Sequence, residues 1–174
     1  VRPGVVFVCL EGASVDGHMY AAAAAQALEA EDEQRIPLLK KAIALYRGDY
    51  LTGEERQSWV AAVRADLHEK YAACALPLME HLNAEQDWDA LLHLATHSTD
   101  IDPFDAPANY YQLQAMLGLG MQPKALEYYN YLQNLYYRER GESLPEQVRS
   151  LYHDIIRHMN NIEIDIAKIT KLFG

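Results

Sequence analysis

Apolar residues recur at intervals of three and four along most of this chain, which is the pattern of amphipathic helices. A clear case is the stretch that begins at Trp59, where an aromatic, an aliphatic and a cationic side chain share one stripe with Leu67. Runs that alternate every second residue, as strands do, are nearly absent. The pattern predicts helices at residues 16–30, 33–47, 57–82, 87–99, 105–118, 122–139 and 145–160.

Prolines and glycines mark the ends of these predicted helices. Pro107, Pro123 and Pro145 fall in first turns, where the missing N–H has no helical partner to lose. Pro103 follows the helix at 87–99 and ends it. Gly48 can adopt the left-handed conformation that ends a helix, so we expect a turn between the second and third helices.

A repeat of 34 residues runs through the second half of the chain. Thirty-four residues is the period of tetratricopeptide repeats, in which each unit is a pair of helices. Combined with the helix pattern, it predicts an all-α fold: a tetratricopeptide-like α-solenoid of about three helix pairs plus a C-terminal helix. The repeat relates Gln86, Leu91, Ala95 and Ser98 to Gly120, Ala125, Tyr129 and Leu132.

The turn near Gly48 also carries a recognisable motif. The segment from Ala44 to Leu51, followed by Trp59, Arg64 and Leu67, resembles the bacterial transcriptional activator domain of SARP-type regulators, which shows "ALxLYRGDxL", then a Trp, an Arg and a Leu. The resemblance covers residues 15–152. It is renewed at residues 140–152, which look like the family's "LGxxPSxELxxLY" segment with Arg140 in place of the leucine. We expect the motif to form a structural joint made of Gly48, Asp49, Tyr50, Leu51, Trp59, Arg64 and Leu67.

The resemblance implies a regulatory and protein-interaction domain of a bacterial transcriptional regulator, with dimerisation as one role. Its protein partners would be a second copy, its own DNA-binding domain or the transcription machinery, and DNA would be bound only through a separate winged-helix domain. We expect residues 1–14 to be a strand or linker from such a preceding domain, 15–160 to be the activator domain, and 161–174 to be a terminal helix or linker.

Charge supports this separation of roles. The net charge is −10, from 15 Lys and Arg against 25 Asp and Glu, and no basic stripe of the kind that binds phosphates is present in the sequence. No apolar run is long enough to cross a membrane. The two cysteines, Cys9 and Cys74, do not suggest a disulfide framework, so we expect a cytoplasmic protein.

Catalytic motifs are missing from the sequence. It contains no glycine-rich phosphate loop, no nucleophile elbow and no His-Glu-x-x-His motif, so we expect no enzyme activity, no cofactor and no metal. His93 and His97 lie four residues apart and can face one way on a helix, which keeps a metal or small-molecule sensor as a third hypothesis. Two ligands alone do not make a metal site.

Seven tyrosines fall in the helix pair at 105–139 and suggest a binding surface, since tyrosine joins a large apolar ring to a polar tip. Tyr129 and Tyr136 share the apolar stripe and belong to the core. We expect Trp88 to be a wedge between helices. An alternative function is therefore a generic adaptor that binds a peptide in its concave groove. The candidate partner surface consists of Tyr110, Lys124, Tyr128 and Tyr131.

Overall fold

The computed structural model describes residues 17–46 and 58–157, and it leaves the side chains of residues 17, 18, 32 and 58–60 undescribed. These ranges are helical and contain no strand, which confirms the predicted tetratricopeptide-like all-α fold. A last helix covers residues 146–157. The others are α1 (Gly17–Glu29), α2 (Asp32–Leu45), α3 (Ser58–Ala84), α4 (Trp88–Ile101), α5 (Ala106–Gly118) and α6 (Gln122–Arg140).

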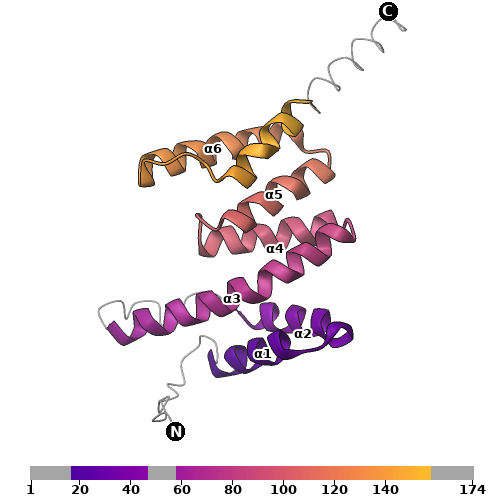
Figure 1. Cartoon of the computed structure of the whole chain (residues 1–174), viewed down its shortest axis with the longest axis vertical. Helices are drawn as coiled ribbons and strands as arrows, with labels where there is room; N and C mark the ends of the chain where they lie inside the picture. The colour runs from indigo at the N-terminus through magenta and orange to yellow at the C-terminus, as the bar shows by residue number, and fades with distance from the viewer. Residues whose placement is uncertain (1–16, 47–57, 158–174) are drawn as a thin grey trace, which may run out of the picture. The chain divides into compact units, whose positions relative to one another are not determined.

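The chain forms two compact units, Val1–Leu78 and Met79–Gly174, and α3 continues from the first into the second. In the first unit, α1 and α2 lie side by side as a helical hairpin (Figure 1). Ala24 and Ala27 of α1 and Ala42 of α2 are buried there. Because alanine side chains are small, the two helices can approach closely.

An aromatic cluster completes the first unit. The ring of Tyr46, which follows α2 directly, lies 5.1 Å from the ring of Tyr20 on α1 and 4.6 Å from the ring of Tyr71 on α3. The ring centres of His68 and Tyr46 lie 6.3 Å apart. Tyr46 thus packs against two helices. Burial is the main cause that raises the pKa of Tyr20 far above its usual value.

In the second unit, α4, α5, α6 and the last helix follow one another in a stack (Figure 1). The buried residues of α4 and α6 have the predicted spacing: Leu91, Ala95 and Ser98 are buried, and so are Ala125, Tyr129 and Leu132, 34 residues later. The first helices of the two repeats, α3 and α5, show the same 34-residue spacing of buried residues. Four buried residues of α3 recur 34 positions on in α5, pairing Cys74, Ala75, Leu78 and Met79 with Ala108, Asn109, Gln112 and Leu113.

The last helix covers the apolar face that α5 and α6 leave open. Its residues Val148, Leu151 and Ile155 are buried in one cluster with Leu113 and Leu132. Since each buried apolar side chain contributes roughly 1.5–3 kcal/mol, this helix stabilises the second repeat substantially. It completes the core of the second unit.

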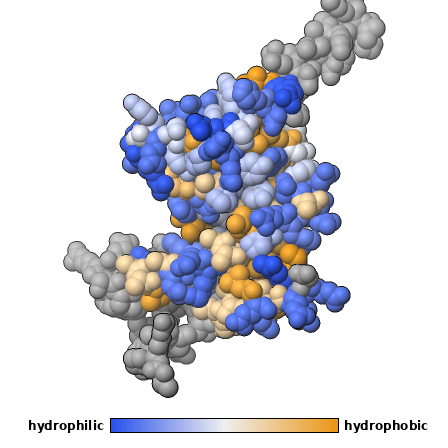
Figure 2. Space-filling view, in the orientation of Figure 1, coloured by the Kyte–Doolittle hydropathy of each residue, from blue (hydrophilic) through white to orange (hydrophobic). Residues whose placement is uncertain are grey.

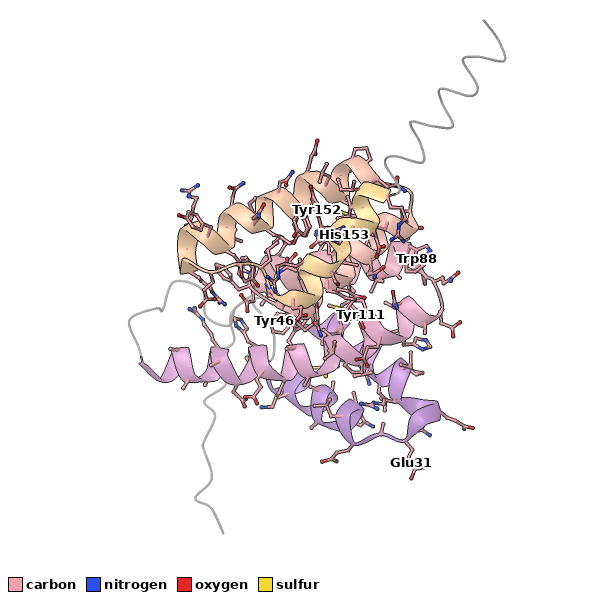
Figure 3. The ribbon with its side chains drawn as sticks, turned by 45° about the horizontal axis from the view of Figure 1, so that its top comes forward. Glu31, Tyr46, Trp88, Tyr111, Tyr152 and His153 are labelled. Atoms are coloured by element: carbon pink, nitrogen blue, oxygen red, sulfur yellow. The ribbon has the colours of Figure 1, made fainter. Side chains whose placement is uncertain are left out.

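Trp88, at the start of α4, lies against Gly118, at the end of α5 (Figure 3). A Cβ atom added to Gly118 would come within 2.3 Å of the Trp88 ring atom Cδ2, so only glycine leaves room for the indole. This contact agrees with the predicted wedge between helices.

Prolines, acidic residues and a glycine lie at the ends of several helices. Pro107 and Pro123 lie in the first turns of α5 and α6, as predicted. Asp87 and Asp105 cap α4 and α5, because their carboxylates accept hydrogen bonds from backbone N–H groups three residues on. Gly141 ends α6 with φ of 67°, a left-handed conformation that favours glycine.

Candidate functional site

A buried polar network ties α4, α5 and α6 together. Thr99 Oγ1 of α4 donates to Gln112 Oε1 of α5 at 2.9 Å, and the Tyr128 hydroxyl of α6 donates to Asn109 Oδ1 of α5 at 2.6 Å. Asn109 Nδ2 donates to two backbone carbonyls of the loop between α4 and α5. Fixed hydrogen bonds of this kind hold the helices in one register.

The same loop is fastened from α6 by aromatic contacts. Tyr136 donates its hydroxyl proton to the Phe104 carbonyl at 3.0 Å, and the two rings meet edge to face with 5.2 Å between their centres. The guanidinium carbon of Arg140 lies 3.9 Å from the centre of the Phe104 ring. The Phe104 ring thus forms a cation–π contact with Arg140.

The three tyrosines of the predicted partner surface belong to two separate aromatic pairs. On α6, Tyr128 stacks on Tyr131 with 6.0 Å between ring centres and 24° between planes, and Tyr131 remains 54 % exposed. Lys124 lies one turn before Tyr128 and is also exposed. Tyr110 lies on α5, where it pairs with Tyr111 instead. The four side chains are therefore held by two different helices.

The α5 pair has a fixed geometry. The rings of Tyr110 and Tyr111 meet at 79° with 5.2 Å between their centres, and Gln114 Nε2 donates to the Tyr110 hydroxyl at 2.9 Å. Both rings are half-buried. Burial raises the pKa of Tyr111, and the nearby carboxylate of Glu80 on α3 raises it further. Glu80 itself is exposed.

This region contains a long stretch without lysine or arginine, which a search for basic clusters does not reveal. Residues 71–123 contain seven Asp or Glu and no Lys or Arg, and we call this stretch the cation-free segment. It runs through the end of α3, all of α4 and all of α5. On the face shown in Figure 2, hydrophilic residues predominate over the second unit and apolar ones are scattered.

Three of these seven acids have local structural roles. Asp87 and Asp105 cap helices, and Asp102 accepts a hydrogen bond from the Phe104 N–H. The other four acids are exposed, and no ion pair within residues 17–46 and 58–157 reaches them. They are Glu80, Glu85, Asp89 and Asp100.

Several residues of the predicted joint lie outside the described residues or have an undescribed side chain. Gly48, Asp49, Tyr50 and Leu51 lie outside the described residues, and Trp59 lies in α3 with its side chain undescribed. Arg64 is half-buried and Leu67 is buried. The expected joint remains a prediction.

The histidine pair lies on α4, with His93 exposed and His97 half-buried. Across the part of the chain that the structure describes, no three His, Cys, Asp or Glu side chains gather as a metal site would need. Cys74 is buried, and burial raises the pKa of its thiol. Within the same residues, no helix is both long and apolar enough to span a membrane.

Comparison with known proteins gives one family. No curated protein and no solved structure matches the chain. The family model of the bacterial transcriptional activator domain matches residues 15–156. This is a regulatory domain of the transcriptional-activator type and not a known family of enzymes. Because the match spans most of the sequence, the chain belongs to the bacterial transcriptional activator domain family.

Proposed function

We propose that this domain regulates transcription through contacts with proteins and leaves DNA binding to a separate winged-helix domain. The carrying observation is its charge, since seven excess negative charges fall within residues 71–123 alone. A polyanion such as DNA is repelled by such a surface, because phosphate binding requires clustered lysine and arginine. The work of this regulator would then be done in the cytoplasm, where bacterial DNA is found.

The exposed tyrosines support a role in protein contacts. Tyr131 and Tyr137 of α6 expose 54 % and 74 % of their surface, and Tyr152 of the last helix exposes 40 %. Tyrosine is enriched at protein interfaces because its ring buries much apolar area while its hydroxyl can still form a hydrogen bond. A second copy, the winged-helix domain and the transcription machinery are the partners that we propose for these rings.

A second candidate, a peptide-binding adaptor, is favoured by the pair formed by Tyr110 and Tyr111. This pair lies on α5, the first helix of its repeat, and presents two half-buried rings. An adaptor would bind a short peptide with the isolated domain, whereas a regulator needs a folded partner. Binding of a short peptide by the 174-residue chain would therefore favour the adaptor.

The absence of DNA contact can be tested with the 174-residue chain itself. Fluorescence anisotropy of a labelled DNA duplex of about 30 base pairs should stay constant up to roughly 20 µM protein at about 100 mM salt, as expected without phosphate contacts. A basic protein of similar size serves as the positive control. A rise in anisotropy that disappears with added salt would sink the division of roles proposed here.

A further inference from the structure

Helix α3 contains a proline in its interior. It runs from Ser58 to Ala84, and Pro77 lies well beyond its first turn. Inside a helix, proline has no N–H to donate to the carbonyl four residues before it, and its ring collides with that carbonyl. Here the carbonyl belongs to Ala73, which lies on the exposed side of α3. The helical hydrogen bonding of α3 is therefore interrupted at Pro77.

The repeat itself does not require this proline. The buried residues of α3 recur in α5 34 positions later, and the position equivalent to Pro77 is Tyr111. Tyr111 lies in the interior of α5, and a side chain other than proline therefore fits this place in the repeat. The prolines of α5 and α6 lie instead in first turns, where a missing N–H costs no helical hydrogen bond. Pro77 thus weakens α3 at a place where another residue would fit.

The boundary between the two compact units falls at the same place. The first unit ends at Leu78, one residue after Pro77, and the second begins at Met79. Both parts of α3 are anchored by packing. In the first unit, the ring of Tyr71 lies 4.6 Å from the ring of Tyr46, and in the second unit Met79 is buried. The interrupted turn therefore lies between two anchored parts of one helix.

We propose that Pro77 is a hinge at which the two units change their relative angle. Hinge motion needs two packed bodies and a short segment between them that absorbs the change in backbone angles. Sharp bends in helices occur mostly at prolines, because the lost hydrogen bond lets the helix bend. α3 can then bend at Pro77 while the core of each unit stays intact. The hinge does not depend on which partner the domain contacts, so it and the proposed function fail separately.

Distances between spin labels on the two units measure the hinge directly. Met19→Cys on α1 and Tyr137→Cys on α6 carry one nitroxide on each unit, since these side chains are 57 % and 74 % exposed. Cys9 is replaced by serine throughout, and Cys74 is buried. Double electron–electron resonance on the 174-residue chain should give a distance distribution about twice as wide as that of a pair within the second unit. Asp89→Cys with Tyr137→Cys is that reference pair.

Pro77→Ala should remove the hinge, because alanine restores the N–H and is the best helix former. The distribution between the units should narrow to the width of the reference pair. Pro37→Ala is the matched control, since Pro37 lies in the interior of α2 and within the first unit, and it should leave the width unchanged. Equal widths in Pro77→Ala and the parent chain would overturn the proposal. Equal narrowing by both proline variants, or a parent distribution no wider than the reference pair, would do the same.

Amide hydrogen exchange locates the motion within α3 and needs no substitution. In the unchanged chain, the amides of residues 78–81 should exchange about tenfold faster than those of residues 112–115, the equivalent positions of α5, because opening at Pro77 exposes them. Pro77→Ala should slow residues 78–81 about tenfold, and Pro37→Ala should not. Exchange at 78–81 as slow as at 112–115 would overturn the hinge, even if Pro77→Ala did not fold.

Discussion

Asn109 forms three side-chain hydrogen bonds inside the second unit. It is fully buried, and its side chain accepts the Tyr128 hydroxyl proton while it donates to the carbonyls of Pro103 and Asp105 at 3.0 and 2.8 Å. An apolar side chain at this place would remove all three of these bonds, although the Asp105 carbonyl would keep its bond from the backbone N–H of residue 109. Asn109 therefore fixes both the loop after α4 and the position of α6.

We expect Asn109→Ala to lower the free energy of unfolding by about 2–4 kcal/mol, because buried polar groups lose their partners. Asn134→Ala is the matched control, since Asn134 makes a single bond to a backbone carbonyl on the exposed side of α6. Its effect should stay within about 0.5 kcal/mol. Urea unfolding followed by circular dichroism measures both. Similar losses in the two variants would contradict this role for Asn109.

For single residues, the sequence predicts buried apolar side chains better than buried polar side chains. Tyr129 and Tyr136 could be placed in the core because they continue an apolar stripe, and both are buried. Asn109 could not, since a polar residue on a helix reads as a surface position in a hydrophobic pattern. Its partners come from another helix and from a loop, and no local spacing encodes them.

At the scale of helices, α4 and α5 meet where a large side chain packs against a glycine. Trp88 fills the space that Gly118 leaves, with its ring where a Cβ atom would be. Alanine is the better helix former by about 1 kcal/mol, but its Cβ atom at position 118 would meet the Trp88 ring, so glycine fits this contact and alanine does not.

Gly118→Ala should therefore destabilise the chain by about 1–3 kcal/mol, as overpacked sites do, in spite of the better helix former. In a Trp88→Leu background the same change should become neutral or stabilising, because the smaller side chain can make room. Thermal unfolding of the four proteins of this cycle measures the coupling. A Gly118→Ala cost that is the same in both backgrounds would rule out the contact as its cause.

Helix positions could be predicted from the sequence to within a few residues, because prolines such as Pro107 and Pro123 and the 34-residue period mark them. The polar contacts between helices could not be predicted in this way. Thr99 and Gln112, for example, lie 13 residues apart on α4 and α5, and only the folded chain brings the hydroxyl to the amide oxygen.

For the whole molecule, the tyrosines make stability depend on alkaline pH. Burial raises the pKa of Tyr128 to about 12, against a hydrogen bond with Thr99 that lowers it, and burial also raises the pKa values of Tyr111, Tyr129 and Tyr136. Their ordinary value is 10.0. Above pH 10 the folded chain therefore holds more protons than the unfolded chain does.

Because the folded state binds more protons in that range, the tyrosine contribution is fully present below about pH 10 and is lost as pH rises toward about 12. We expect the melting temperature to fall steadily across this window. Circular dichroism melts at a series of pH values measure it, and the absorbance of tyrosinate near about 295 nm should rise together with unfolding. A melting temperature that is constant up to about pH 11.5 would show that the buried phenols do not control it.

The cation-free segment also affects how this protein is digested by trypsin and how it reacts with lysine reagents. Trypsin cuts after lysine and arginine, so it releases α4 and α5 in one piece, between Lys70 and Lys124, even from the unfolded chain. Reagents that attach to lysine side chains likewise leave Glu80, Tyr110 and Tyr111 unmodified. A chain immobilised through its lysine side chains is thus attached outside the cation-free segment, whereas coupling through carboxylates would also use the seven acids within it.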